Sequence, residues 1–156
     1  MNMRNDIERI IKEFSLDRNN IFEVSKQTYA AIADKIRAVF IKNNGPIHWS
    51  NINGSIKDSE HICISGNGLW YHNLLNCVDN NELMYVLFED TKAYEPKYWL
   101  YEIKVRELIT VLDESSWLSD YYIVSKKFNW LISENHEEHI CFSGQGITLK
   151  TLIKSV

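Results

Sequence analysis

Histidine and cysteine recur at one spacing in two segments of the chain. Residues 60–69 read EHICISGNGL, and residues 138–147 read EHICFSGQGI. In each copy one residue separates histidine from cysteine, so on a strand both side chains point to the same face. Two such strands side by side would gather a ligand set of the kind that zinc prefers. That set is His61, Cys63, His139 and Cys141, and a zinc- or small-ligand-binding protein built on it is one hypothesis.

The same four residues also have a plainer interpretation. Structural zinc sites usually carry Cys-x2-Cys turns, and reduced cysteine is among the most buried residue types. We therefore favour two core cysteines beside two strand-edge histidines, without a metal. A cysteine nucleophile beside a base is a further alternative, but catalysis needs one asymmetric constellation with an orienting third group. Because a repeated backbone shape explains the duplication better, we expect no catalytic residue and no enzyme.

Each histidine–cysteine pair leads into a short glycine-rich segment, SGNG at residues 65–68 and SGQG at residues 143–146. Backbone amides in such a turn can face an anion. Neither copy has the three glycines of a dinucleotide site or the Gly-Lys-Ser/Thr ending of a phosphate loop. The glycines are therefore interpreted as turn residues, and no cofactor is expected.

The most polar connection is residues 133–139, which read SENHEEH. It places three carboxylates and two imidazoles between two expected strands. A solvated turn is the ordinary interpretation, since charged residues are common in turns. The functional interpretation is an acidic surface that meets a basic partner, because complementary charge speeds association and selects partners.

Hydrophobic spacing predicts an α+β fold. Apolar residues three and four apart predict helices over residues 6–14, 22–41 and 105–112. Strand-like runs occupy residues 83–88, 98–103, 121–124 and 129–132. Short polar connections favour a largely antiparallel sheet with the N-terminal helices packed on it. The duplicated segment predicts an internal strand–turn–helix repeat within a single domain over residues 1–156.

Composition excludes several classes of protein. A net charge of −4 over 156 residues lacks the basic footprint of a nucleic-acid-binding protein. No apolar run is long enough for a membrane span, and the first residues lack a secretory signal. The expectation is a cytoplasmic protein with reduced cysteines. Aromatic residues make up 12% of the chain, enough to serve both a core and a binding face.

One stretch carries a resemblance to a known class. Residues 121–124 (YYIV) and 128–136 (FNWLISENH) resemble a pattern in small bacterial proteins, some similar to immunity proteins that neutralise polymorphic or contact-delivered toxins. The resemblance covers about the last third of the chain and implies no catalytic residue.

The leading hypothesis is therefore a non-enzymatic cytoplasmic immunity protein that binds a basic toxin domain. Its expected contact residues are Glu134, Glu137, Glu138 and Trp130. A domain that self-associates through surface aromatic residues is the remaining alternative.

Overall fold

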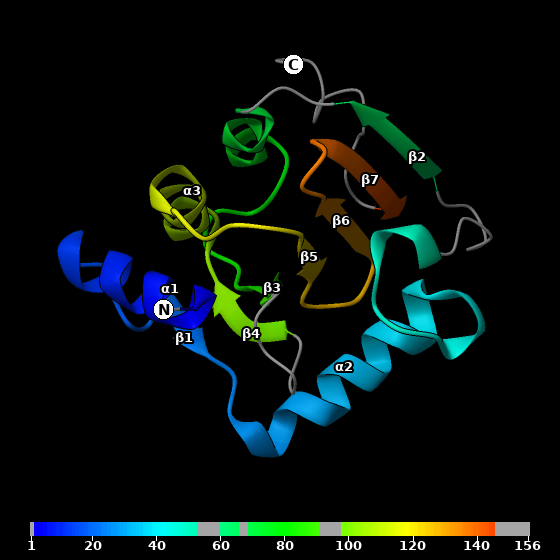
Figure 1. The fold of residues 1–156 in the computed structure, drawn as a ribbon, viewed down its shortest axis with the longest axis horizontal. Coiled ribbons are helices and arrows are strands. Elements are labelled where there is room, and N and C mark those ends of the chain that lie inside the picture. The colour runs from blue at the N-terminus through cyan, green and yellow to red at the C-terminus, as the bar shows by residue number, and fades with distance from the viewer. Residues whose placement is uncertain (1, 53–59, 66–68, 91–97, 146–156) are drawn as a thin grey trace.

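The computed structural model describes residues 2–52, 69–90 and 98–145, together with the backbone of residues 60–65. It has the predicted α+β fold, with helices at the N-terminus (Figure 1). The α-helices are α1 (Met3–Glu13), α2 (Lys26–Phe40) and α3 (Val105–Glu114). Three 3-10 helices accompany them: η1 (Lys42–Asn44), η2 (Trp49–Asn51) and η3 (Trp70–Asn76).

The described strands form one sheet with the order β1-β4-β3-β5-β6-β7-β2. They are β1 (Ile21–Glu23), β2 (Glu60–Ser65), β3 (Met84–Glu89), β4 (Tyr98–Ile103), β5 (Tyr121–Ser125), β6 (Trp130–Glu134) and β7 (His139–Gly144). Every neighbouring pair is antiparallel, as expected from the short connections. Strands β5, β6 and β7 follow one another along the chain and in the sheet, so their connections are turns at the sheet ends.

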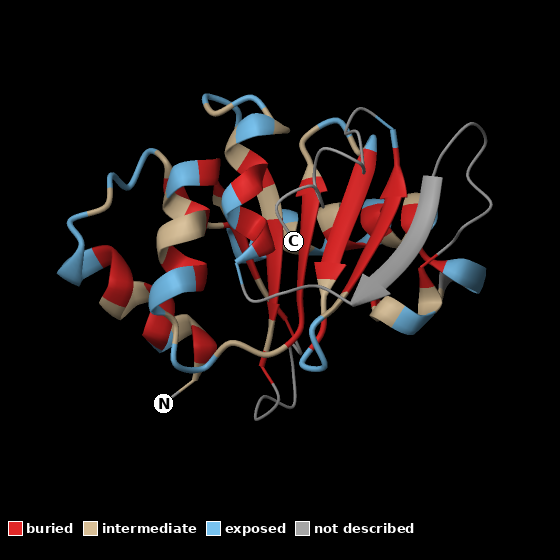
Figure 2. Ribbon diagram, turned by 90° about the horizontal axis from the view of Figure 1, so that it is seen from above, coloured by how far each residue is buried: buried red, intermediate tan, exposed pale blue. Residues whose placement is uncertain are grey.

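One face of the sheet packs against α1, α3 and η3. The buried stripe of α1 includes Ile7 and Ile10, and it meets inward-facing strand residues such as Val86 in a single apolar cluster. Asn2 starts this helix, because its side chain accepts a hydrogen bond from the Asn5 backbone N–H at 2.9 Å. Figure 2 shows that buried residues fill the central strands and the helix sides turned toward them.

The opposite face of the sheet packs against α2. Ile36 and Phe40 of this helix share a second apolar cluster with Leu87 of β3. Neighbouring aromatic residues divide between the two faces, since Tyr121 belongs to the first cluster and Tyr122 to the second. Most aromatic residues of the central strands are therefore core residues.

The predicted helix over residues 22–41 is wrong at its beginning. Phe22 belongs to β1, and α2 begins at Lys26. The Val24 backbone N–H donates to the Leu100 carbonyl at 2.9 Å, which keeps this segment attached to β4. Pairing with a neighbouring strand thus outweighs the local helical spacing.

The two copies of the repeat supply neighbouring strands, β2 and β7, at one side of the sheet. Their register places Cys63 opposite Cys141. The first glycine turn and the segment after Gln145 lie outside the described residues. The strand–turn–helix repeat therefore stays a prediction beyond its strands. Within the described ranges, no helix is both long and apolar enough to cross a membrane.

Candidate functional site

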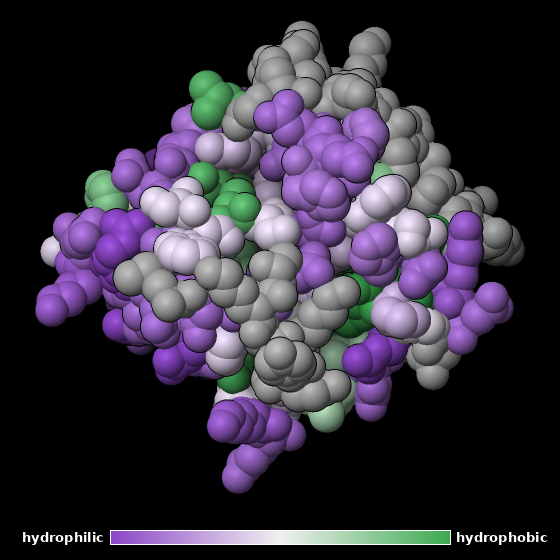
Figure 3. Space-filling view, viewed as in Figure 1, coloured by the Kyte–Doolittle hydropathy of each residue, from purple (hydrophilic) through white to green (hydrophobic). Residues whose placement is uncertain are grey.

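The connection between β6 and β7 is a tightly bonded turn, here called the acidic turn (residues 135–138). Asn135 is only 3% exposed, and its side-chain oxygen accepts the backbone N–H of Glu137 and of His139, each at 2.9 Å. The Glu138 backbone N–H also donates to the Asn135 carbonyl at 2.9 Å. These bonds fix the backbone while the side chains of Glu137 and Glu138 remain exposed. Hydrophilic side chains gather around this turn in Figure 3.

A buried carboxylate on the neighbouring strand connection supports the acidic turn. Asp120 is 3% exposed and accepts the His136 backbone N–H at 2.8 Å and contacts the His136 ring Nδ1 at 3.0 Å. The hydrogen bond with Asp120, followed by the charge of that carboxylate, raises the pKa of His136. Because Asp120 precedes β5, this contact ties the acidic turn to the middle of the sheet.

Glu137 stands between two imidazoles. Its carboxylate oxygens lie 3.9 Å from Nε2 of His136 and 3.8 Å from Nδ1 of His139. Protonation of His136 offsets the negative charge of the turn, and its deprotonation increases it. The charge that the acidic turn presents therefore depends on pH around neutrality.

Glu138 has a left-handed backbone conformation, with φ of 61°. Glycine or asparagine is the usual residue in that region, because a β-carbon is crowded there. Such positions cost of order 1–3 kcal/mol and cluster at functional sites. Ser15, Asn43 and Phe128 also have a positive φ, and in the acidic turn this conformation is held by a charged, exposed residue.

Of the four expected contact residues, Glu134 is partly buried and Trp130 is buried. The Glu134 carboxylate accepts the Trp70 indole N–H at 2.8 Å and the Tyr121 hydroxyl at 2.7 Å. Burial raises the pKa of Glu134 against the opposing effect of those bonds. Trp130 is only 7% exposed and packs in the first apolar cluster. Trp130 therefore lies in the core rather than on a contact surface, whereas Glu137 and Glu138 are exposed. That Glu134, Glu137 and Glu138 contact a partner stays a prediction.

The His-x-Cys strands are adjacent, but their register separates the histidines. His61 lies opposite Ser143, and His139 lies opposite Ser65, with the cysteine pair between them. Residues four positions apart along a strand are about 13 Å apart, too far for one tetrahedral centre. The described side chains include no group of metal-ligand residues, and the side chains of His61 and Cys63 lie outside the described part of the chain. The register does not support the four-residue zinc set.

The cysteines also differ from the sequence expectation. Cys141 is disulfide-bonded and 1% exposed. Cys77 is free, and burial raises the pKa of its thiol. The expectation that the cysteines are reduced is therefore wrong for Cys141. A disulfide-bonded sulfur is unavailable as a thiolate ligand or nucleophile.

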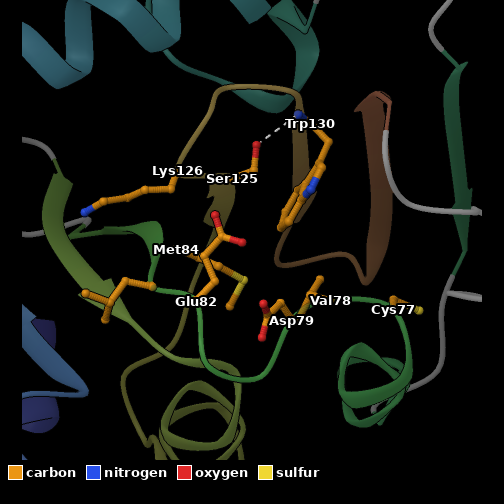
Figure 4. Close-up of a pocket in the computed structure, with 9 residues that line it drawn as sticks. Cys77, Val78, Asp79, Glu82, Met84, Ser125, Lys126 and Trp130 are labelled. Carbon is orange, nitrogen blue, oxygen red and sulfur yellow. Dashed lines mark hydrogen bonds between the residues drawn. The ribbon is translucent and has the colours of Figure 1, made fainter.

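A small hollow lies at the opposite end of β6 from the acidic turn. This cavity, here called the Trp130 cavity, has a volume of about 150 Å³. Its wall includes Val78, Asp79, Glu82, Met84, Ser125 and Trp130 (Figure 4). Met84 and Trp130 are buried, whereas Asp79 and Glu82 are exposed. The cavity thus has an apolar floor and an acidic rim.

Sequence reasoning found the acidic turn from its cluster of charges but missed the residues that hold it. Asn135 was part of the polar run, and its role as an internal acceptor follows only from the turn geometry. Asp120 lies 16 residues from its partner His136. The Trp130 cavity was also missed, because its wall joins segments that are far apart in the chain.

Comparison with known proteins places the chain in a family without a described activity. No curated protein and no solved structure shows a significant match to it. A model of a family of unknown function, DUF6756, matches residues 1–154, so the chain belongs to the DUF6756 family.

Proposed function

We propose that the protein is a non-enzymatic binding module, a cytoplasmic immunity protein that neutralises a bacterial toxin through the acidic turn. The observation that carries this proposal is the left-handed Glu138 in an exposed, internally bonded turn. The turn holds Glu138 in a left-handed conformation, which Ser15, Asn43 and Phe128 also adopt, and it presents a carboxylate there.

The chemistry of the turn favours a basic partner. Glu137 and Glu138 are adjacent and exposed, and their carboxylates give the turn a local negative charge. Opposite charge on a partner accelerates encounter and selects against other acidic proteins. The hydrogen bonds that Asn135 and Asp120 accept from the turn backbone fix the turn before binding. Little ordering entropy is then lost on association, which favours affinity.

The proposal is tested by affinity capture of the tagged protein from the cytosol of its native cell. We expect a basic protein to co-purify in comparable amount, and we expect Glu137→Lys/Glu138→Lys to abolish its recovery. The control is Glu114→Lys, because Glu114 is exposed at the end of α3, away from the acidic turn. The control should retain the partner.

A second step distinguishes an immunity protein from any other binding protein. The captured partner, expressed alone in bacteria, should arrest growth. Co-expression of the wild-type protein should restore growth, and co-expression of the double lysine variant should not. A partner that is harmless alone, or that binds the double variant normally, contradicts the proposal.

A further inference from the structure

The imidazole of His136 is held beside the acidic turn by contacts that persist when the ring loses its charge. Its backbone N–H donates to Oδ1 of Asp120 at 2.8 Å, and its ring Nδ1 lies 3.0 Å from the same oxygen. An ionised carboxylate only accepts hydrogen bonds, so Nδ1 carries a hydrogen in the neutral ring as well as in the charged ring. The ring therefore stays beside Asp120 throughout its titration, and its charge is what changes.

The other ring nitrogen of His136 faces Glu137. Nε2 lies 3.9 Å from Oε1 of the Glu137 carboxylate, which is too long for a hydrogen bond but close enough for attraction between opposite charges. In the charged ring Nε2 carries a hydrogen, whereas in the neutral ring with Nδ1 protonated it presents a lone pair. Glu137 therefore has an internal counter-charge in His136 only while that histidine is protonated.

Several carboxylates face His136 from different parts of the fold. Asp120 precedes β5, Glu137 belongs to the turn, and Glu89 ends β3, where its backbone N–H donates to the Asp120 carbonyl at 2.9 Å. The hydrogen bond and charge of Asp120 raise the pKa of His136 most, burial opposes them, and Glu137 and Glu89 add smaller increases. On the far side of Glu137, Nδ1 of His139 lies 3.8 Å from Oε2, so a test must separate the two imidazoles.

A basic partner needs the same carboxylate that His136 neutralises. The Glu137 side chain is 60% exposed, so a cation from outside can reach it. We infer that protonated His136 is an autoinhibitory cation, which pairs with Glu137 at low pH and leaves it to a basic partner at higher pH. This inference rests on the proposed function, because it describes the regulation of the same acidic turn. Binding is then linked to proton release, since a cation on Glu137 weakens the hold of His136 on its proton.

The first experiment uses the free protein and needs no partner. The side-chain carboxyl carbon of Glu137 is followed by NMR from about pH 5 to about pH 9, across the range in which histidine titrates. We expect an inflection of this signal at the pKa of His136, which His136→Gln should remove and His139→Gln should keep. The control is His72→Gln, because His72 pairs with Asp113 instead, and it should also keep the inflection. A Glu137 signal without an inflection at the pKa of His136 overturns the inference.

The second experiment measures binding of an N-acetylated tetralysine amide at low ionic strength, read from the backbone amide signal of Glu137. The probe keeps its charge throughout, because the pKa of lysine is about 10.4. We expect its affinity to rise about 2- to 5-fold between about pH 5.5 and about pH 8.5, as expected for the loss of one exposed competing ion pair. His136→Gln should lose most of this rise, and His72→Gln should keep it. An equal rise in His136→Gln, or affinity independent of pH, overturns the inference alone, whereas no binding at either pH overturns the proposed function as well.

Discussion

The buried carboxylate of Asp120 holds His136 twice, through the backbone N–H at 2.8 Å and through ring Nδ1 at 3.0 Å. One oxygen, Oδ1, makes both contacts, so the position of the imidazole is fixed to the position of the turn backbone. This double contact connects an exposed titratable ring to the rigid middle of the sheet. The protonation state of His136 therefore affects both the charge of the acidic turn and its anchoring to the sheet.

The first prediction concerns the pH dependence of this contact. The hydrogen bond and charge of Asp120 raise the pKa of His136 above its ordinary value of 6.5. A raised pKa in the folded state means that the pair stabilises the fold fully below pH 6.5 and loses this contribution as pH rises through the folded pKa. We expect His136→Gln to remove this part of the pH dependence of the unfolding temperature. Asp120→Asn should return the pKa of His136 toward 6.5, as measured by NMR titration. A pKa that is the same in the Asp120→Asn variant would show that Asp120 is not the cause.

A second prediction separates the two kinds of glutamate around the turn. Glu134→Leu leaves the Trp70 indole and the Tyr121 hydroxyl without their acceptor. Each unsatisfied buried donor costs about 1–3 kcal/mol, so urea denaturation should show a loss of at least about 2 kcal/mol in unfolding free energy. The matched control is Glu137→Leu, an exposed position, with an expected change within about 0.5 kcal/mol. Equal losses in the two variants would contradict a stabilising role for the hydrogen bonds that Glu134 accepts.

The pKa of Glu134 gives a related prediction. Because burial raises this pKa in the folded state, ionisation of Glu134 costs stability as pH rises from the ordinary value of 4.5 through the raised value. Glu134→Gln cannot ionise, so its unfolding free energy should change less over this range than that of the wild-type protein. Parallel denaturation series at several pH values measure the difference. Identical slopes for the two proteins would exclude a raised pKa.

Regular periodicity explains which parts of the fold could be predicted. The i, i+3, i+4 spacing around Ile7 and Ile10 indicated α1, and the alternation of Tyr121 and Tyr122 placed their rings on opposite faces. The three-residue β1 was missed, because its pairing partner β4 lies about 80 positions later in the chain. Local spacing carries no information about such a partner.

The same limit applies to the candidate site. The acidic turn could be predicted, because its charges are consecutive. The role of Glu134 could not, since its donor Trp70 is 64 residues away. Residue type alone suggested a surface carboxylate and a surface aromatic ring, but long-range hydrogen bonds partly bury Glu134 and packing buries Trp130. The His-x-Cys spacing within each repeat also suggested that the two copies share one metal site. The antiparallel register of β2 and β7 instead separates His61 from His139.

Gly144 provides a test of the structural interpretation of the repeated glycines. Its φ is 124°, and a β-carbon at this position would overlap the Asn129 carbonyl and the Trp130 Cα. Both obstacles are backbone atoms of the strand connection, which cannot move without breaking the pairing of β6 with β7. We expect Gly144→Ala to cost at least about 2 kcal/mol in unfolding free energy, since strain and a clash act together. Gly45→Ala is the control, because its nearest atom would be 3.4 Å away. A Gly144→Ala variant as stable as the control would show that the glycine has another role.

The last prediction addresses the backbone of Glu138. Replacement by glycine relieves the crowding at φ of 61°, so Glu138→Gly should leave stability unchanged or raise it by up to about 1 kcal/mol. Glu137 has no positive φ, and Glu137→Gly should lower stability by about 0.5–1 kcal/mol, because glycine adds freedom to the unfolded chain. Chemical denaturation of both variants measures these opposite signs. Under the proposed function, Glu138→Gly should nevertheless bind the captured partner more weakly than the wild-type protein. A stabilised variant that also binds normally would show that the strained carboxylate is dispensable, and the acidic turn would then lose the observation that supports its function.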